Sequence, residues 1–205
     1  MGNVNTSTNL SAFPGGVQDD RLLPLCVWFT GLSGSGKTTL ARGLERRLID
    51  MGVLARVLDG DDLRVGLNRD LGFRAQDRKE NVRRLGEVAK LFHDSGFIVL
   101  VSAISPFAED RQAARSLFTA GRFIEVHVAT PLEVCEARDP KGLYQRARRG
   151  DLPGFTGIES AYEPPRDCEC VVPSERCTVD EGVQQVLDII RQYGGSGYPG
   201  EGKGA

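Results

Sequence analysis

The stretch most suited to chemistry is Gly31–Thr38, which reads Gly-Leu-Ser-Gly-Ser-Gly-Lys-Thr and fits the pattern G-x-x-x-x-G-K-[ST]. The glycines let the backbone turn tightly and direct its N–H groups at an anion. Lys37 can reach the outer phosphates of a nucleotide, and the Thr38 hydroxyl can bind Mg²⁺. An apolar run, Leu25–Phe29, precedes the loop and leucines at helical spacing follow it. This strand–loop–helix context adds the helix dipole to the anion site, so the stretch predicts binding of a nucleoside triphosphate.

A second reactive group follows the next apolar segment and reads Asp59-Gly-Asp-Asp-Leu-Arg64. One carboxylate could accept a proton from a substrate hydroxyl while another helps to hold Mg²⁺. The same run is also typical of a helix N-cap, and the two interpretations are compatible. The following apolar segment ends at Ser102 and Ala103, and no acidic residue stands there, where a Walker-B carboxylate often binds the metal. The Asp59–Asp62 group is therefore favoured as the source of the metal-binding carboxylate.

A basic segment, Arg138–Arg149, precedes a glycine-rich loop at 150–157, and this composition is typical of a lid. Cations closing over the phosphates would neutralise charge during phosphoryl transfer, although surface arginines are often simply solvated. Asp139–Gly142 matches the GTPase pattern D-x-x-G. It follows the fourth expected strand, not the third, and no Asn-Lys-x-Asp motif occurs anywhere in the sequence, which excludes a GTPase.

Apolar runs alternate with helical patterns along the chain. We expect strands at 25–30, 55–58, 97–103, 123–129 and 170–172, and helices at 37–51, 77–95, 108–120, 132–138, 143–149 and 178–193. Residues 59–75 have little periodicity and are expected to form a loop. Alternation of this kind predicts an α/β fold: a doubly wound parallel sheet of about five strands with helices on both faces, of the P-loop NTPase kinase type. Ligands of such sheets bind at the carboxyl ends of the strands.

The 205 residues suggest one domain, at 21–193, between flexible tails at 1–20 and 194–205. A net charge of −2 gives no general attraction to nucleic acid or to an anionic membrane surface. We find no apolar run long enough to span a membrane and no signal-peptide pattern. The cysteine count is odd, at five, so we expect free thiols and a cytoplasmic location. Cys168, Cys170 and Cys177 alone are too few for a four-ligand metal site.

Several independent segments within about Cys26–Pro165 resemble the adenylyl-sulfate kinase (APS kinase) family. The matching segments are 28–39, 59–64, 66–68, 70–73, 77–81, 104–106, 135–144 and 155–158. The most specific are Asp-Pro-Lys-Gly-Leu-Tyr144 and Phe155-Thr-Gly-Ile. The resemblance implies transfer of the γ-phosphoryl group of ATP to the 3′-hydroxyl of adenosine 5′-phosphosulfate (APS). The product would be 3′-phosphoadenosine 5′-phosphosulfate, the activated sulfate donor.

The resemblance also implies residue roles. ATP would contact Gly31, Leu32, Ser33, Gly34, Ser35, Gly36, Lys37, Thr38, Thr39 and Arg138, with Mg²⁺ at Thr38 and Asp59. APS would contact Asp59, Asp61, Arg64, Phe73, Arg78, Asn81, Ile104, Ser105, Lys141, Gly154 and Phe155. Phe73 and Phe155 would stack on the adenine, while Arg64, Arg78 and Asn81 would hold the phosphosulfate.

Four residues are the catalytic candidates: Lys37, Asp61, Ser105 and Lys141. Asp61 would orient or deprotonate the 3′-hydroxyl, and the two lysines would stabilise the transferred group. Family members carry a phosphoserine at the position of Ser105, yet in-line transfer requires no such intermediate. The segment near Cys177–Val179 would help to hold the ATP adenine.

Two departures from the family are visible at the site: Asp62 stands where Asn is usual, and Ala103 stands where a bulky aromatic is common. The resemblance suggests a homodimer that receives APS from a separate ATP sulfurylase. Two alternatives remain open at this point. One is another small P-loop kinase acting on a nucleoside, a sugar acid or a shikimate-like substrate, and the other is an ATP-binding module without turnover.

Overall fold

The computed structural model describes residues 22–194. Five parallel strands form one sheet in the order β2-β3-β1-β4-β5. They are β1 (Cys26–Thr30), β2 (Ala55–Asp59), β3 (Ile98–Ser102), β4 (Phe123–Val128) and β5 (Cys170–Val172). Every residue of β1 and β3 is buried, as expected of mainly apolar central strands covered on both faces. The expected doubly wound parallel sheet is confirmed. The expected tails lie outside the described residues, except for Gly194.

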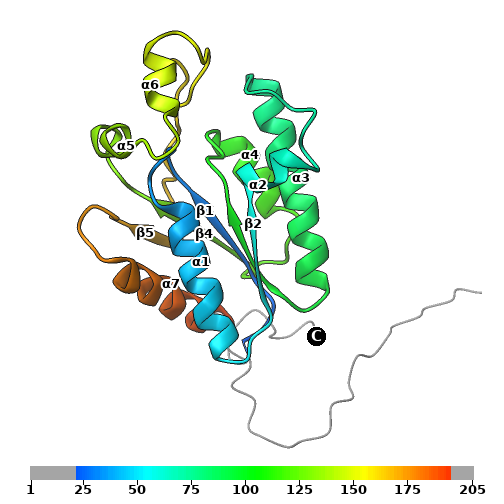
Figure 1. Ribbon diagram of the computed structural model, residues 1–205. Coiled ribbons are helices and arrows are strands. Elements are labelled where there is room, and N and C mark those ends of the chain that lie inside the picture. The colour runs from blue at the N-terminus through cyan, green and yellow to red at the C-terminus, as the bar shows by residue number, and fades with distance from the viewer. Residues whose placement is uncertain (1–21, 195–205) are drawn as a thin grey trace, which may run out of the picture.

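Helices cover both faces of the sheet (Figure 1). They are α1 (Lys37–Asp50), α2 (Gly60–Val65), α3 (Ala75–Asp94), α4 (Ala108–Arg115), α5 (Leu132–Arg138), α6 (Leu143–Arg148) and α7 (Val179–Gly194). Side chains alternate along β1, so Val27 and Phe29 join a core under α1 and α7, while Cys26 and Trp28 join a second core under α3 and α4. Each fully buried apolar side chain contributes roughly 1.5–3 kcal/mol.

Most expected boundaries are within one residue of the structure, and the three larger differences include two that side-chain caps explain. The segment expected as a loop at 59–75 contains α2, which is N-capped by Asp59: its Oδ1 accepts a hydrogen bond from the Asp61 N–H at 2.9 Å. Helix α3 begins two residues early, where Asp77 Oδ2 accepts from the Arg74 N–H at 3.2 Å. Helix α4 ends at Arg115 and not at 120, because the chain tightens into i→i−3 turns.

The segment after β4 has a small core of its own, formed by Cys135, Tyr144, Ala147, Leu152 and Phe155. Helices α5 and α6 stand beyond the carboxyl ends of the strands (Figure 1). The lid predicted from the sequence, residues 138–157, lies within this segment, and we call residues 132–158 the lid below. None of the helices within 22–194 has the length and apolar character needed to cross a membrane.

Candidate active site

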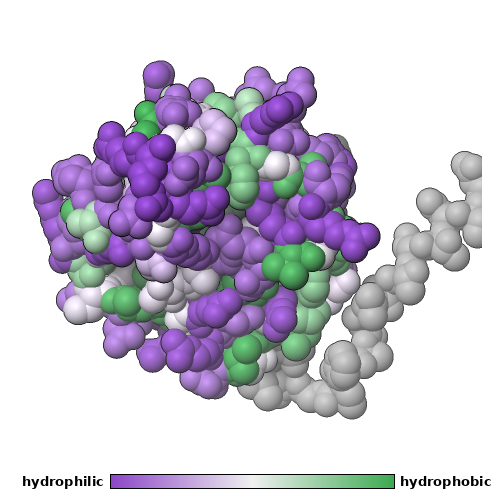
Figure 2. Space-filling view, turned by 45° about the horizontal axis from the view of Figure 1, so that its top comes forward, coloured by the Kyte–Doolittle hydropathy of each residue, from purple (hydrophilic) through white to green (hydrophobic). Residues whose placement is uncertain are grey.

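A cavity of about 780 Å³ lies at the carboxyl ends of the strands. It is lined by the P-loop, the start of α1, helices α2 and α3, the 102–106 turn, the lid and residues 174–179. Figure 2, which brings this end of the sheet forward, shows a largely hydrophilic face. Most of the predicted site residues line this cavity. Four do not, namely Gly31, Leu32, Ser35 and Gly154.

Side chains hold the carbonyl oxygens of the P-loop. The Tyr144 hydroxyl donates to Ser33 O at 2.9 Å. The hydroxyls of Thr130 and Ser174 both donate to Ser35 O, at 2.9 and 2.8 Å. Fixing these carbonyls also fixes the peptide planes to which the loop's N–H groups belong, and such N–H groups are what bind phosphate.

Lys37 is the buried cation of the loop, with a residue exposure of 8%. Its Nζ donates to Gly31 O at 3.0 Å and to Leu32 O at 2.6 Å. Burial lowers the pKa of Lys37 to about 8, against the opposing attraction of Asp61. Gly31 has a φ of 151°, and a Cβ there would lie 2.7 Å from Val128 O, so only glycine fits where the loop leaves β1.

Oxygen ligands suited to Mg²⁺ meet where α1 begins and where β2 and β3 end. Thr38 Oγ1 donates to Asp59 Oδ2 at 2.6 Å and lies 3.2 Å from Ser102 Oγ. Mg²⁺ prefers a carboxylate or hydroxyl together with phosphate oxygens and water, so these residues fit the ion. Within 22–194, no three His, Cys, Asp or Glu side chains gather as a metal site. Phosphate and water would therefore supply the remaining ligands.

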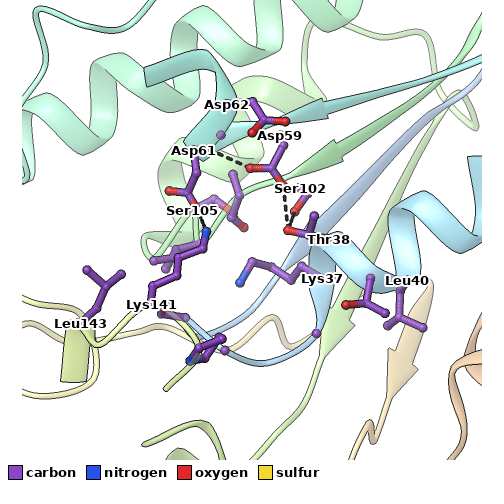
Figure 3. Close-up of a pocket in the computed structure, with 18 of the residues that line it drawn as sticks. Lys37, Thr38, Leu40, Asp59, Asp61, Asp62, Ser102, Ser105, Lys141 and Leu143 are labelled. Carbon is purple, nitrogen blue, oxygen red and sulfur yellow. Dashed lines mark hydrogen bonds and ion pairs between the residues drawn. The ribbon is translucent and has the colours of Figure 1, made fainter. Parts of the chain in front are cut away.

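Asp61 and Lys141 form an ion pair across the cavity, between α2 and the lid (Figure 3). Burial lowers the pKa of Lys141, but the hydrogen bond to Asp61 and the nearby Asp59 and Asp62 outweigh it, so the pKa is raised overall. Asp62 pairs with Arg42 of α1 at 3.2 Å, and both side chains are exposed. The predicted carboxylates and lysines are thus brought together around one opening.

The two arginines predicted to hold the phosphosulfate are themselves held by backbone carbonyls, on the α2–α3 side and in the lid. Arg64 donates to Leu71 O and Gly72 O at 3.1 and 2.9 Å, and its guanidinium lies 4.5 Å from the Phe73 ring centroid. Arg78 donates to Phe73 O at 2.9 Å and to Gly154 O at 3.1 Å. Burial lowers the pKa of both side chains from the usual high value, and an arginine remains a cation.

The two predicted stacking rings differ in environment. Phe73 is 43% exposed, whereas Phe155 is buried and packs edge-on against Tyr144 with ring centroids 5.0 Å apart. Asn81 is buried, and its Oδ1 accepts from Asn68 Nδ2 at 3.0 Å. Both rings and Asn81 line the same cavity.

Ser105 is buried and has a φ of 40°, a conformation rare for a non-glycine residue. Its Oγ accepts from Trp28 Nε1 at 3.0 Å. Sequence reasoning missed the residues that support this turn and the P-loop. Tyr144 lies in the Asp-Pro-Lys-Gly-Leu-Tyr segment, but the sequence alone assigns it no function. Arg111 has no local sequence signal beyond its place on an amphipathic helix.

A P-loop after β1, carboxylates after β2 and a basic lid after β4 define the class of protein as a P-loop kinase. A family model described as "Adenylylsulphate kinase" matches residues 23–173, and the chain belongs to this family.

Similar proteins agree in name. The chain is 57% identical over 171 residues to "Adenylyl-sulfate kinase" of Geotalea daltonii, covering 83% of this chain and 84% of that protein. It is 54% identical over 171 residues to "Probable adenylyl-sulfate kinase" of Halalkalibacterium halodurans, covering 83% and 85%. Among solved structures, the APS kinase of Mycobacterium tuberculosis in complex with AMPPNP and APS matches with a TM-score of 0.79 and 51% identity, covering 83% of this chain and 99% of that one.

Proposed function

We propose that this chain is an adenylyl-sulfate kinase, which transfers the γ-phosphoryl group of ATP to the 3′-hydroxyl of APS. One observation carries the proposal. The triphosphate-binding loop and the aromatic–arginine set of Phe73, Phe155, Arg64 and Arg78 line a single cavity. A donor nucleotide and a second anionic nucleotide can therefore face each other there.

The donor half would be built around the P-loop. Lys37 would turn from its loop carbonyls to the outer phosphates, and Thr38 with Asp59 would hold Mg²⁺, which neutralises charge developing on the phosphates. Arg138, whose Nη1 lies 3.4 Å from Gly34 O, and the Cys177–Val179 segment would border the adenine.

The acceptor half would bind APS between Phe73 and Phe155, with Arg64, Arg78 and Asn81 on the phosphosulfate. Asp61 would accept the proton of the 3′-hydroxyl of APS. At the same time the hydroxyl oxygen would bond to the γ-phosphorus, and the bond between that phosphorus and ADP would break. Lys141, which pairs with Asp61, would move to the transferred phosphoryl group together with Lys37.

The test is ADP release with and without APS, in the presence of Mg²⁺ and ATP. We expect APS to stimulate release strongly and the product to gain one phosphoryl group at the 3′ position. A panel of nucleoside, sugar acid and shikimate acceptors tests the alternative metabolite kinases. Release that depends on one of those acceptors, or ATP binding without any APS-dependent release, would contradict the proposal.

We also propose a cytoplasmic homodimer that depends on Mg²⁺ and receives APS from a separate ATP sulfurylase. All five cysteines are free thiols, which fits a reducing compartment. Sedimentation velocity tests the oligomeric state: we expect a species of twice the chain mass, and a monomer at micromolar concentration would contradict it.

A further inference from the structure

The turn at Ile104–Pro106 joins β3 to α4 and lines the cavity. Ser105 at its centre has a φ of 40°, a strained conformation that persists only where surrounding contacts over-determine it. The contacts that hold this turn therefore determine where its backbone and hydroxyl stand relative to a ligand.

Three side chains from behind the turn hold it. Trp28 Nε1 donates to Ser105 Oγ at 3.0 Å, and Thr30 Oγ1 donates to Ile104 O at 2.7 Å. Arg111 Nη1 donates to Ser105 O at 2.7 Å. Trp28 and Thr30 lie on β1, the strand that leads into the P-loop, whereas Arg111 lies on α4.

Arg111 joins the turn to two other segments. Its side chain is 3% exposed, and its Nε donates to Glu125 Oε1 on β4 at 2.6 Å. Its Nη2 donates to Glu163 O at 2.8 Å. A single guanidinium thus joins the turn, the sheet and the 163 segment, and its planar fork fixes all three in one geometry.

The Glu163 segment supports the same turn independently. Its N–H donates to Pro106 O at 2.9 Å, and its carboxylate accepts from the Ala108 N–H at the start of α4 at 2.7 Å. Loss of the Arg111 contact would release the Glu163 carbonyl and leave Ser105 O with only the longer bond from Thr30 Oγ1, at 3.5 Å.

We propose that Arg111, paired with Glu125, is a positioning residue that holds the Ser105 turn in the geometry that binds the acceptor. The inference rests on the proposed function. It adds Arg111 to the residues needed for acceptor binding, although Arg111 does not line the cavity. The P-loop does not depend on Arg111, so its loss weakens binding of the acceptor and not of ATP.

Arg115 provides a matched control one turn along α4. It also pairs with Glu125, at 3.4 Å, and with Glu169 at 2.6 Å, but its backbone partner is Phe123 O, away from the turn. Removing Arg115 disturbs the same buried network without releasing Ser105.

The experiment compares Arg111→Gln, Arg111→Lys, Thr30→Val and Arg115→Gln with the wild type. Isothermal titration gives dissociation constants for APS and for a non-hydrolysable ATP analogue, and thermal melting gives Tm.

We expect the Arg111 variants to bind APS about 10- to 100-fold more weakly, and Thr30→Val about 3- to 10-fold. All should hold the ATP analogue within about twofold. Arg115→Gln should lower Tm but bind APS like the wild type. Arg111→Lys keeps a positive charge beside Glu125, and Thr30→Val keeps a β-branched residue in β1. These two variants therefore still test the inference if Arg111→Gln fails to fold.

Two results would overturn the inference: unchanged APS affinity in folded Arg111→Lys and Thr30→Val, or an equal loss of APS affinity in Arg115→Gln. A wild type that binds no APS would instead contradict the proposed function, an outcome that the variants cannot produce.

Discussion

Lys37 is a buried cation whose nearest acceptors are carbonyl oxygens of its own loop. Burial lowers its pKa to about 8, so near neutral pH it keeps a proton that it can lose easily. A triphosphate beside it favours the protonated form. The protonation of this one residue and the binding of ATP are therefore coupled.

The first prediction follows from this coupling. ATP raises the pKa of Lys37, so binding at pH 8 takes up protons. Affinity falls as the pH rises above about 8, by up to about tenfold per pH unit. Titration calorimetry in buffers of different ionisation enthalpy measures the uptake. Lys37→Met should abolish phosphoryl transfer and show no uptake from this group, whereas equal uptake in that variant would refute the assignment.

The second prediction separates two neighbouring carboxylates. Asp61 pairs with Lys141 of the lid, whereas Asp62 pairs with Arg42 of α1, and both exposed pairs line the cavity. Asp61→Asn should lower kcat by about 10²- to 10⁴-fold and leave ATP binding nearly unchanged, because it loses the proton acceptor. Asp62→Asn removes a surface pair worth at most about 1 kcal/mol and should turn over normally. Steady-state kinetics decides, and full activity in Asp61→Asn would remove its proposed role.

Among the elements, the lid is joined to the P-loop by Tyr144 of α6. Its hydroxyl donates to Ser33 O, and its ring packs against Phe155. Burial raises the pKa of this phenol, so it remains a donor at neutral pH. One side chain thus links the donor loop to a ring proposed for the acceptor.

The third prediction is that Tyr144→Phe weakens ATP binding severalfold and lowers the free energy of unfolding by about 0.5–1.5 kcal/mol, because it removes the hydrogen bond to Ser33 O and keeps the ring. Tyr162→Phe is the control, since its hydroxyl bonds Thr30 Oγ1 at 3.0 Å and not the P-loop. Denaturant unfolding and calorimetry give both quantities. Equal ATP affinities in the two variants would argue against the link.

For the whole molecule, the sheet is stabilised by two cores, one on each face. Helix α3 contributes to the second core through one face only. Leu85 is fully buried there, whereas Leu91 on the same helix is 67% exposed. Burial, and not helix propensity, therefore decides what each leucine contributes.

The fourth prediction compares one substitution at these two sites. Leu85→Ala should lower the free energy of unfolding by about 2–5 kcal/mol through lost transfer energy and a cavity. Leu91→Ala should change it by less than about 1 kcal/mol. Urea denaturation measures both, and similar losses at the two sites would contradict the two-core description.

Much of the fold could be predicted because its signals are local. The strands are apolar runs, and the last helix starts at a capping box in which Thr178 N donates to Glu181 Oε2 at 2.7 Å. Helix α2 escaped prediction because six residues are too few for a visible period, although its Asp59 cap was in the sequence. The order of the strands was not predicted, since pairing of parallel strands depends on distant segments.

The sequence alone determined the phosphate-binding loop, the carboxylates after β2 and the family, because each depends on residue types at short, defined spacing. The tertiary structure decided which of these groups meet. The sheet order and the lid bring Lys141 to Asp61 although they lie 80 residues apart, and Arg111 to both Ser105 and Glu125. Such contacts have no local pattern, since they depend on which strand ends become neighbours when the cores pack.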